Sequence, residues 1–393
     1  MDLAEVFRRS PGRLLVLIGL AAALAAPPAG AAQWRFVFFG DTQDETWGPW
    51  INTNIFAELS RAVVREQASF LLFGGDMANH PQPAVPPAWT NIAAPLYEAQ
   101  IPIFPTIGNH DEWAIAETVQ AVGHMLPDNG PPGEIDQTYA VAFSNALIVV
   151  LNAFIPGREY TINQPWLDAV LQTNTLRHVF VMSHPPAFPV YHNTNACLAL
   201  YPDRRDALWR SLVRAGCRVY FSGHDHFYDR CRVDDGDGNP ENDVYQVVSG
   251  TGGAAIYPDS YWYAYRGTNG IGNDGPWLPT RILHDPANGY VLVEIEDERV
   301  TLTWKRRTGP DTFEPNDVFT YVARPPRPRL DFAFEPRDSQ GTHIRRLTLH
   351  WPDGAVLQAA PDPRGPYTNV VGAVPPFIVP NAGPDRMFFR VVR

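Results

Sequence analysis

Lysine is nearly absent from the 393-residue sequence: Lys305 is the only one, so arginine supplies almost all of the 31 basic Lys and Arg side chains. Acidic residues number 42, and the formal net charge is -11. This charge repels phosphate polymers and anionic lipids, which argues against broad binding of nucleic acids or membrane surfaces. A small anionic substrate would therefore need a local source of positive charge, and metal ions are the obvious one.

Cysteine is scarce as well. The three cysteines, Cys197, Cys217 and Cys231, form no C-x-x-C pair, which argues against a cysteine-based metal site. An odd number in an oxidising compartment favours one disulfide and one buried thiol. Cys217 begins a strand-like segment, whereas the other two are expected in loops. We therefore predict a disulfide between Cys197 and Cys231.

Long apolar runs are also few, and the longest covers residues 14–26. The run is preceded by Arg8, Arg9 and Arg13, and small residues follow it as far as Ala32. This is the pattern of a secretory signal peptide. The run is shorter than the roughly 20 residues that span a bilayer. We predict a signal peptide over residues 1–32, a secreted or periplasmic bacterial protein, and no membrane anchor after cleavage.

The length exceeds what one hydrophobic core usually organises, so we expect one large domain and one small one. A proline-rich linker at residues 324–330 separates a domain over residues 33–323 from a module over residues 331–393. Short strand signals between turn residues predict a small all-β sandwich for this module. The sequence indicates neither its ligand nor an oligomeric state.

The larger domain begins with strand and helix patterns in alternation. Apolar runs at residues 34–39, 70–73 and 101–107 predict buried strands, and residues 51–67 and 89–100 between them have helical spacing. The class is therefore α/β, and Asp41, Asp76 and Asn109 follow the three strands in turn. We expect these side chains at one sheet edge, where open α/β sheets bind ligands.

Further strands are predicted near residues 139–151, 178–182, 218–221, 245–249 and 290–304, with helices opened by Pro165 and over residues 204–215. The Gly-, Tyr- and Pro-rich stretch 252–286 is too long for a plain connector, so we expect a lid or wall near a site. Its aromatic residues either stack on a substrate or pack the loop, and packing is favoured. They are Tyr257, Tyr261, Trp262, Tyr263 and Tyr265.

Five short polar motifs follow the predicted strands. They are Gly40-Asp41-Thr42-Gln43, Gly75-Asp76, Gly108-Asn109-His110-Asp111, Ser183-His184 and Gly223-His224-Asp225-His226. In this order they closely resemble the calcineurin-like metallophosphoesterase superfamily, over about residues 34–305. The resemblance implies two packed β-sheets flanked by helices, with a site for two divalent metal ions such as Mn, Fe or Zn between them.

The resemblance also implies roles for individual residues. Asp76 would bridge the two metals, and a hydroxide shared by the metals would attack a phosphomonoester or phosphodiester. His110 would assist the leaving group, while Asp111 would fix the tautomer of His110. The other implied ligands are Asp41, Gln43 and His226 for the first metal and Asn109, His184 and His224 for the second. His124, His192 and His284 match no motif, so we interpret them as surface or packed histidines.

Two positions depart from familiar patterns. Gln43 stands where the first motif of the superfamily usually has His, and its neutral amide predicts weaker binding of the first metal. Asn79 stands where purple acid phosphatases need a Tyr ligand, which argues against that subfamily.

The leading hypothesis is a secreted phosphatase or phosphodiesterase acting on a small phosphorylated substrate. The alternative is a weak or inactive binding protein that uses the C-terminal module for surface recognition.

A second metal hypothesis concerns residues 235–243, where acidic and amide side chains alternate as in a Ca²⁺ loop. Pro240 replaces the glycine that such a loop requires, and Gln246 stands where a bidentate Glu is needed. A solvated acidic turn is the favoured interpretation.

Arg158 and Arg266 are candidate contacts for a substrate phosphate, but no sequence pattern indicates where they lie relative to the site.

Overall fold

The computed structural model describes residues 33–44, 50–79, 85–112, 115–122, 126–192, 194–257, 277–323, 331–336, 344–351, 355–379 and 387–392. The predicted signal peptide, the proline-rich linker and residues 258–276 of the aromatic stretch lie outside this range, as do His124 and Arg266. The chain divides near residue 324 into two compact units. No helix among the described residues is long and apolar enough to cross a membrane.

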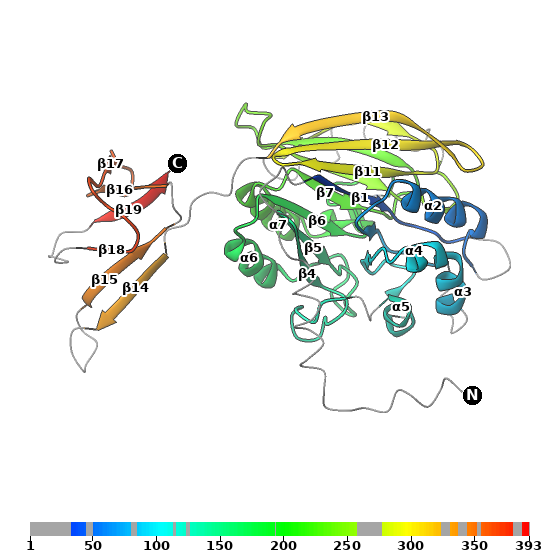
Figure 1. Cartoon of the computed structure of the whole chain (residues 1–393), viewed down its shortest axis with the longest axis horizontal. Helices are drawn as coiled ribbons and strands as arrows, with labels where there is room; N and C mark the ends of the chain where they lie inside the picture. The colour runs from blue at the N-terminus through cyan, green and yellow to red at the C-terminus, as the bar shows by residue number, and fades with distance from the viewer. Residues whose placement is uncertain are drawn as a thin grey trace. The chain divides into compact units, whose positions relative to one another are not determined.

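The larger unit contains two mixed β-sheets (Figure 1). The first sheet has six strands in the order β13-β12-β11-β1-β2-β3, of which β1, β2 and β3 run parallel. These strands are β1 Gln33–Phe39, β2 Leu71–Phe73, β3 Ile103–Pro105, β11 Gly289–Glu296, β12 Arg299–Gly309 and β13 Thr312–Val322.

The second sheet has seven strands in the order β10-β8-β9-β7-β6-β5-β4, with a parallel centre from β5 to β9. Its strands are β4 Tyr139–Phe143, β5 Ala146–Leu151, β6 His178–Ser183, β7 Val219–Ser222, β8 Tyr228–Asp234, β9 Val244–Ser249 and β10 Leu278–Asp285. Strand β10 corrects the predicted lid, because part of the stretch 252–286 pairs with β8 instead of forming a loop.

The core between the sheets follows from the alternation of side chains along β1. Phe36 and Phe38 face the second sheet, and the ring centroid of Phe38 lies 4.7 Å from that of Phe221. Val37 and Phe39 point the other way, into a separate core beneath the helices. Where β1 is buried on both faces, over residues 36–39, it is apolar throughout, as the sequence predicted.

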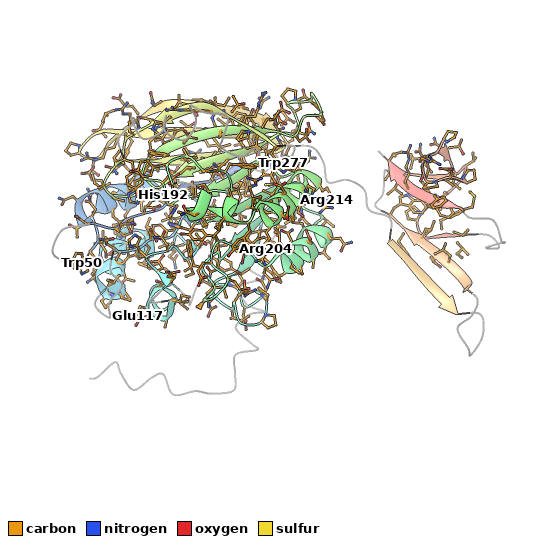
Figure 2. All side chains as sticks on the ribbon, turned by 180° about the vertical axis from the view of Figure 1, so that it is seen from behind. Trp50, Glu117, His192, Arg204, Arg214 and Trp277 are labelled. Atoms are coloured by element: carbon orange, nitrogen blue, oxygen red, sulfur yellow. The ribbon has the colours of Figure 1, made fainter. Side chains whose placement is uncertain are left out.

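Helices cover the outer faces of both sheets (Figure 1). On the first sheet they are α2 Thr53–Arg65, α3 Val85–Ile92, α4 Ala94–Glu98 and α5 Ile115–Val122. On the second sheet they are α6 Gln164–Thr173 and α7 Pro202–Ala215, with the short 3₁₀ helices η4 Thr194–Ala196 and η5 Leu198–Leu200 nearby. Trp277, labelled in Figure 2, packs in the core of this second layer. The predicted sandwich of two sheets between helices is confirmed.

Side-chain caps set the helix ends. Asn52 accepts a hydrogen bond from the N–H of Ile55 and starts α2, and Asn163 starts α6 in the same way. Gly216 ends α7 in the left-handed conformation that glycine adopts without strain.

In the described residues of the smaller unit there are two three-stranded sheets, β14-β15-β18 and β17-β16-β19. Their strands are β14 Asp331–Pro336, β15 Ile344–His350, β16 Val356–Ala360, β17 Thr368–Asn369, β18 Phe377–Ile378 and β19 Phe388–Val392. Leu349, Trp351 and Leu357 form their shared core. Every regular element described in this unit is a strand, as the turn-rich sequence predicted.

The disulfide prediction is wrong in this structure: Cys197, Cys217 and Cys231 are all buried thiols. Cys231 lies inside β8, opposite Gln246 of β9, and not in the loop that the sequence suggested. A residue within a paired strand has a fixed side-chain direction, which limits the partners that Cys231 can reach.

Candidate metal centre

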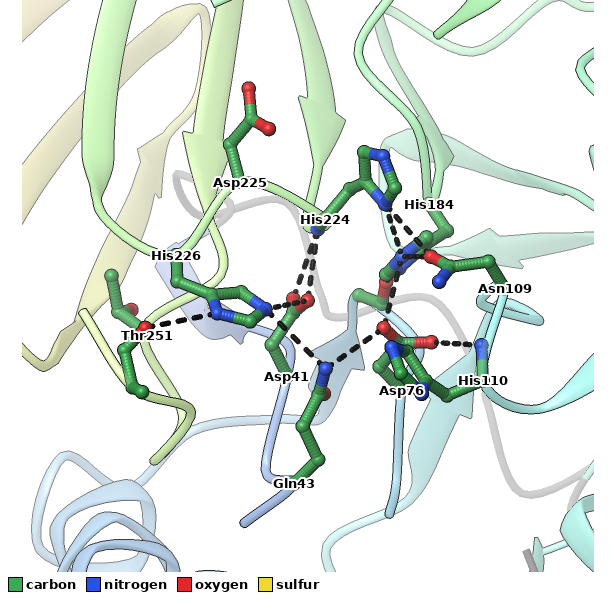
Figure 3. A network of polar contacts seen from close by, with 12 residues as sticks. Asp41, Gln43, Asp76, Asn109, His110, His184, His224, Asp225, His226 and Thr251 are labelled. Atoms are coloured by element: carbon green, nitrogen blue, oxygen red, sulfur yellow. Dashed lines mark hydrogen bonds and ion pairs between the residues drawn. The ribbon is translucent and has the colours of Figure 1, made fainter. Parts of the chain in front are cut away.

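The ends of the strands deliver the predicted ligands to one place between the two sheets (Figure 3). Asp41, Asp76 and Asn109 follow β1, β2 and β3 of the first sheet. His184 follows β6 of the second sheet, and the motif with His224 and His226 follows β7. All these side chains are largely or fully buried except Asn109, which is partly exposed.

Glycine is required where these turns approach each other. A Cβ on Gly108 would lie 2.0 Å from Asp76 Oδ1, and one on Gly223 would lie 2.3 Å from Asp41 Oδ2. Asp41, Asp76 and His224 themselves adopt left-handed backbone with φ of 63°, 57° and 70°. Such strain at non-glycine residues is typical of functional sites, where the surrounding structure enforces it.

Three of the predicted ligands form one half of the site. Asn109 Oδ1 lies 3.0 Å from His184 Nε2 and 2.8 Å from His224 Nδ1, and these two nitrogens are 3.2 Å apart. His184 Nε2 also lies 3.4 Å from Asp76 Oδ2, which connects this half to the other.

The remaining predicted ligands form the second half around Asp41 and Asp76. His226 Nε2 lies 3.6 Å from Asp41 Oδ1, and Gln43 Nε2 lies 3.2 Å from Asp76 Oδ2 and 3.4 Å from His226 Nε2. Gln43 Oε1 is buried and has no hydrogen-bond partner among the described residues. The structure thus brings all seven predicted ligands together, with Asp76 between the two halves.

The hydrogen bonds of the histidines show that these residues fit bound cations. His184 Nδ1 lies 2.6 Å from the carbonyl oxygen of Gly74, and His226 Nδ1 lies 3.0 Å from that of Ala255. A carbonyl accepts only, so in each neutral ring Nδ1 carries the hydrogen and Nε2 presents its lone pair inward. These lone pairs converge on carboxylate and amide oxygens, an arrangement of acceptors that a cation stabilises.

Protonation agrees with this assignment for two of the imidazoles. Burial lowers the pKa of His226 to about 4 and, with His192 and His184, holds the pKa of His224 well below its usual value. Both rings are therefore neutral and able to bind metal at neutral pH. Burial opposes the charge on His184, but Asp76 and Asp41 outweigh it and raise the pKa of His184 to about 10. A cation in the site would take over this compensation of the two carboxylates.

Comparison with known proteins agrees with the motifs. The family model described as calcineurin-like phosphoesterase matches residues 35–228, which contain every predicted ligand. Over these residues the chain belongs to the calcineurin-like phosphoesterase family. Members of this family hydrolyse phosphoric esters. A comparison with curated proteins found no match.

Several solved structures share the fold. A purple acid phosphatase from yellow lupin (Lupinus luteus) seeds has a TM-score of 0.55 at 15% identity, covering 76% of this chain and 55% of the lupin protein. PhoD has a TM-score of 0.55 at 13% identity, covering 76% of this chain and 72% of PhoD. A dimetal phosphatase from Danio rerio has a TM-score of 0.50 at 13% identity, with coverage of 74% and 99%. The chain therefore spans little more than half of the lupin enzyme.

His110 lies beside the predicted ligands, but Asp111 does not hold it. The backbone N–H of His110 donates to Asp76 Oδ1 at 2.9 Å, and His110 Nδ1 lies 2.8 Å from the carbonyl oxygen of Asn79. Asp111 instead accepts hydrogen bonds from the backbone N–H groups of Gly108, Asp76 and Met77, at 2.9, 2.7 and 3.1 Å. The predicted tautomer role of Asp111 is therefore wrong. The carbonyl of Asn79 fixes that tautomer, and Asp111 shapes the turns that carry the ligands.

His192 is a residue of the candidate site that sequence interpretation missed. Its Nδ1 lies 2.5 Å from Asp225 Oδ1, and its ring centroid lies 4.2 Å from that of His224 (Figure 2 labels its position). Asp225 also accepts the N–H of Tyr191 at 2.9 Å. Asp225 stands between two ligand histidines in the sequence, which was a usable signal, whereas nothing in the sequence placed His192.

Tyr257 packs against the predicted ligand His226. Its ring stacks on His226 with centroids 4.3 Å apart, and Tyr191 stacks on Tyr257 at 4.0 Å. Tyr257 therefore packs against the site, as favoured from the sequence.

Two other residues singled out in the sequence lie in other contacts. Arg158 pairs with Glu134 at 3.1 Å, and His284 lies in β10 against Phe227.

Proposed function

We propose that this chain is a secreted phosphoesterase that hydrolyses small phosphomonoesters or phosphodiesters with two divalent metal ions. The observation that carries the proposal is the convergence of two ligand clusters on Asp76. Asp41, Gln43 and His226 lie on one side of it, and Asn109, His184 and His224 on the other. Divalent ions held there would lower the pKa of bound water and offset the charge of a phosphate group.

The protein's own groups complete the site. The backbone of His110 is anchored to Asp76, and its ring is held by the carbonyl of Asn79 through Nδ1. This leaves Nε2 as the nitrogen able to meet the leaving oxygen of a substrate. His110 would stabilise or protonate that oxygen, which is a contribution made in the transition state.

Two residues support the proposal that this chain is not a member of the purple acid phosphatase subfamily. Asn79 occupies the place of their tyrosine ligand, and its carbonyl is already engaged with His110. Gln43 offers a neutral oxygen where the family usually has imidazole, which favours weaker binding of the first metal. The same feature supports the second candidate, a weakly active binding protein whose C-terminal unit recognises a surface.

Location and partners are proposed from the sequence. Residues 1–32 have the pattern of a secretory signal, which supports a secreted or periplasmic enzyme without a membrane anchor. The net charge of -11 supports a small phosphorylated substrate over a nucleic-acid polymer.

Turnover of p-nitrophenyl phosphate and bis(p-nitrophenyl) phosphate with added Mn²⁺ tests the proposal. We expect the wild-type protein to hydrolyse at least one of the two and Asp76→Asn to lose both metal and activity. His110→Ala should keep its metal and lose roughly a hundredfold in turnover, because it acts on the leaving oxygen. A fully metal-loaded wild-type protein that hydrolyses neither ester would favour the binding protein.

A further inference from the structure

The loop between β8 and β9 brings three carboxylates together. One oxygen each of Asp234, Asp235 and Asp243 lies within 4.8 Å of the others. Asp234 ends β8, Asp243 directly precedes β9, and Val233 pairs with Val244 beside them. Strand β8 starts near the metal centre and runs away from it, so this cluster lies on the order of 20 Å farther along the strand.

Asp243 is the member of the cluster that most requires a partner. Only 2% of it is exposed, and neither carboxylate oxygen accepts a hydrogen bond of normal geometry from the described residues. Arg232 pairs with it at long range, with Nε 3.6 Å from Asp243 Oδ2, and gives only partial compensation because Nε also lacks a hydrogen-bond partner among the described residues. A buried carboxylate without hydrogen bonds is costly unless a positive ion compensates it.

The electrostatics of Asp243 agree with its geometry. Burial and the neighbouring Asp234 raise the pKa of Asp243, while Arg232 and the nearby backbone of Asp235 act in the opposite direction. Three carboxylates and one guanidinium leave a formal charge that a single dication balances.

The loop is held in place from behind. Arg218 donates to the carbonyl oxygens of Asp243 at 2.8 Å and Pro240 at 3.3 Å, and also to that of Glu241. These bonds fix the backbone while the carboxylates of the cluster face each other. The cluster is therefore formed in advance, which lowers the entropic cost of binding an ion.

The two objections from the sequence do not apply to this cluster. Both assumed the ligand spacing of a helix-flanked calcium loop, in which Gln246 would be the last ligand. In the structure Gln246 lies in β9, where its amide group makes two hydrogen bonds to the backbone of Phe188. The convergent residues are Asp234, Asp235 and Asp243, so the relevant framework is a strand hairpin.

We propose that Asp234, Asp235 and Asp243 bind a calcium ion. Calcium accepts carboxylate oxygens in irregular arrangements, whereas Mg²⁺ demands a near-octahedral set and dehydrates reluctantly. The ion would join the ends of β8 and β9 and satisfy the buried Asp243. This proposal does not depend on the phosphoesterase activity.

Isothermal titration of Ca²⁺ into the full chain, with its active site already loaded with Mn²⁺, tests the proposal. We expect one saturable site with a Kd on the order of 10⁻⁴ M, as in extracellular calcium modules, or tighter. Asp243→Asn should weaken binding at least tenfold. Glu241→Gln removes the same charge from the same loop but lies outside the cluster, and it should change affinity less than about threefold.

Three results would overturn the calcium site: no saturable heat at millimolar Ca²⁺, unchanged affinity in Asp243→Asn, or equal affinity for Mg²⁺. If Asp243→Asn fails to fold by circular dichroism, Asp235→Asn at the more exposed position replaces it, with the same tenfold loss expected. A rise in Tm with Ca²⁺ that Glu241→Gln retains and Asp235→Asn loses would support the site independently.

Discussion

Gln43 is the residue at which this metal centre departs from its family. Its amide lies within 3.4 Å of both Asp76 and His226, so an imidazole at this position would reach the same ion. We expect Gln43→His to tighten the weaker metal by about tenfold to a hundredfold, a range typical of changes around metal sites. Activity at limiting Mn²⁺ should rise, while activity at saturating Mn²⁺ should change less. Unchanged metal affinity would show that Gln43 is not a ligand.

His192 is expected to position a ligand. Its ring packs against the ring of His224 and is tethered to Asp225, so it restricts the orientation of His224. His192→Ala should weaken the metal bound by His224 about tenfold, measured by competition with a chelating dye. His192→Phe keeps an aromatic ring at this position and should restore most of the affinity. If neither variant changes metal affinity and only KM rises, His192 contacts substrate instead.

For individual residues, the sequence motifs predicted the ligands but not their hydrogen-bond partners. The predicted ligands came from the family resemblance, which the polar motifs after the strands carry in the sequence. Hydrogen-bond partners are not visible in this way. Asp111 follows His110 directly, yet its oxygens bond to backbone N–H groups of Gly108, Asp76 and Met77, because the turns there need acceptors. His192 comes from a loop whose path only tertiary packing decides.

At the scale of elements, the turns after the strands are as specific as the ligands. A Cβ on Gly108 would lie 2.6 Å from the backbone nitrogen of Asp76 and even closer to its carboxylate. We expect Gly108→Ala to displace Asp76, to destabilise the protein by about 1–3 kcal/mol and to lower metal content.

Gly309→Ala is the matched control for this change, because its new Cβ would lie 4.0 Å from the nearest atoms. It should leave metal content unchanged and alter Tm little. Chemical denaturation and metal analysis of both variants provide the comparison. Equal metal content in Gly108→Ala and Gly309→Ala would show that the site tolerates movement of Asp76.

Elements were predictable where hydrophobic pattern and neighbours agreed. β1, β5 and β6 contain continuous apolar runs because both of their faces are buried there, and this pattern identified them. β10 was missed because its residues alternate between exposed and half-buried at the edge of the second sheet, beside a stretch rich in turn residues. Its pairing with β8 comes from tertiary contact and has no local signature.

At the scale of the whole molecule, every predicted ligand lies in the larger unit. The smaller unit has its own core around Trp351. We therefore expect a chain ending at residue 324 to fold, to bind the same metals and to keep its turnover of small esters within about twofold. Circular dichroism, metal analysis and the ester assay check this. Loss of folding or metal on truncation would show that the smaller unit supports the site.

We propose that the ligand clusters on either side of Asp76 would each hold a metal ion and that both ions would be needed for turnover. The most direct test of this proposal is a titration of metal-stripped protein with Mn²⁺, following bound metal and ester turnover in the same samples. We predict that the first equivalent binds tightly and gives little activity, and that turnover appears with a second, weaker equivalent and reaches a plateau at about two per chain. Saturation at one equivalent, or two bound ions without turnover, would contradict the account.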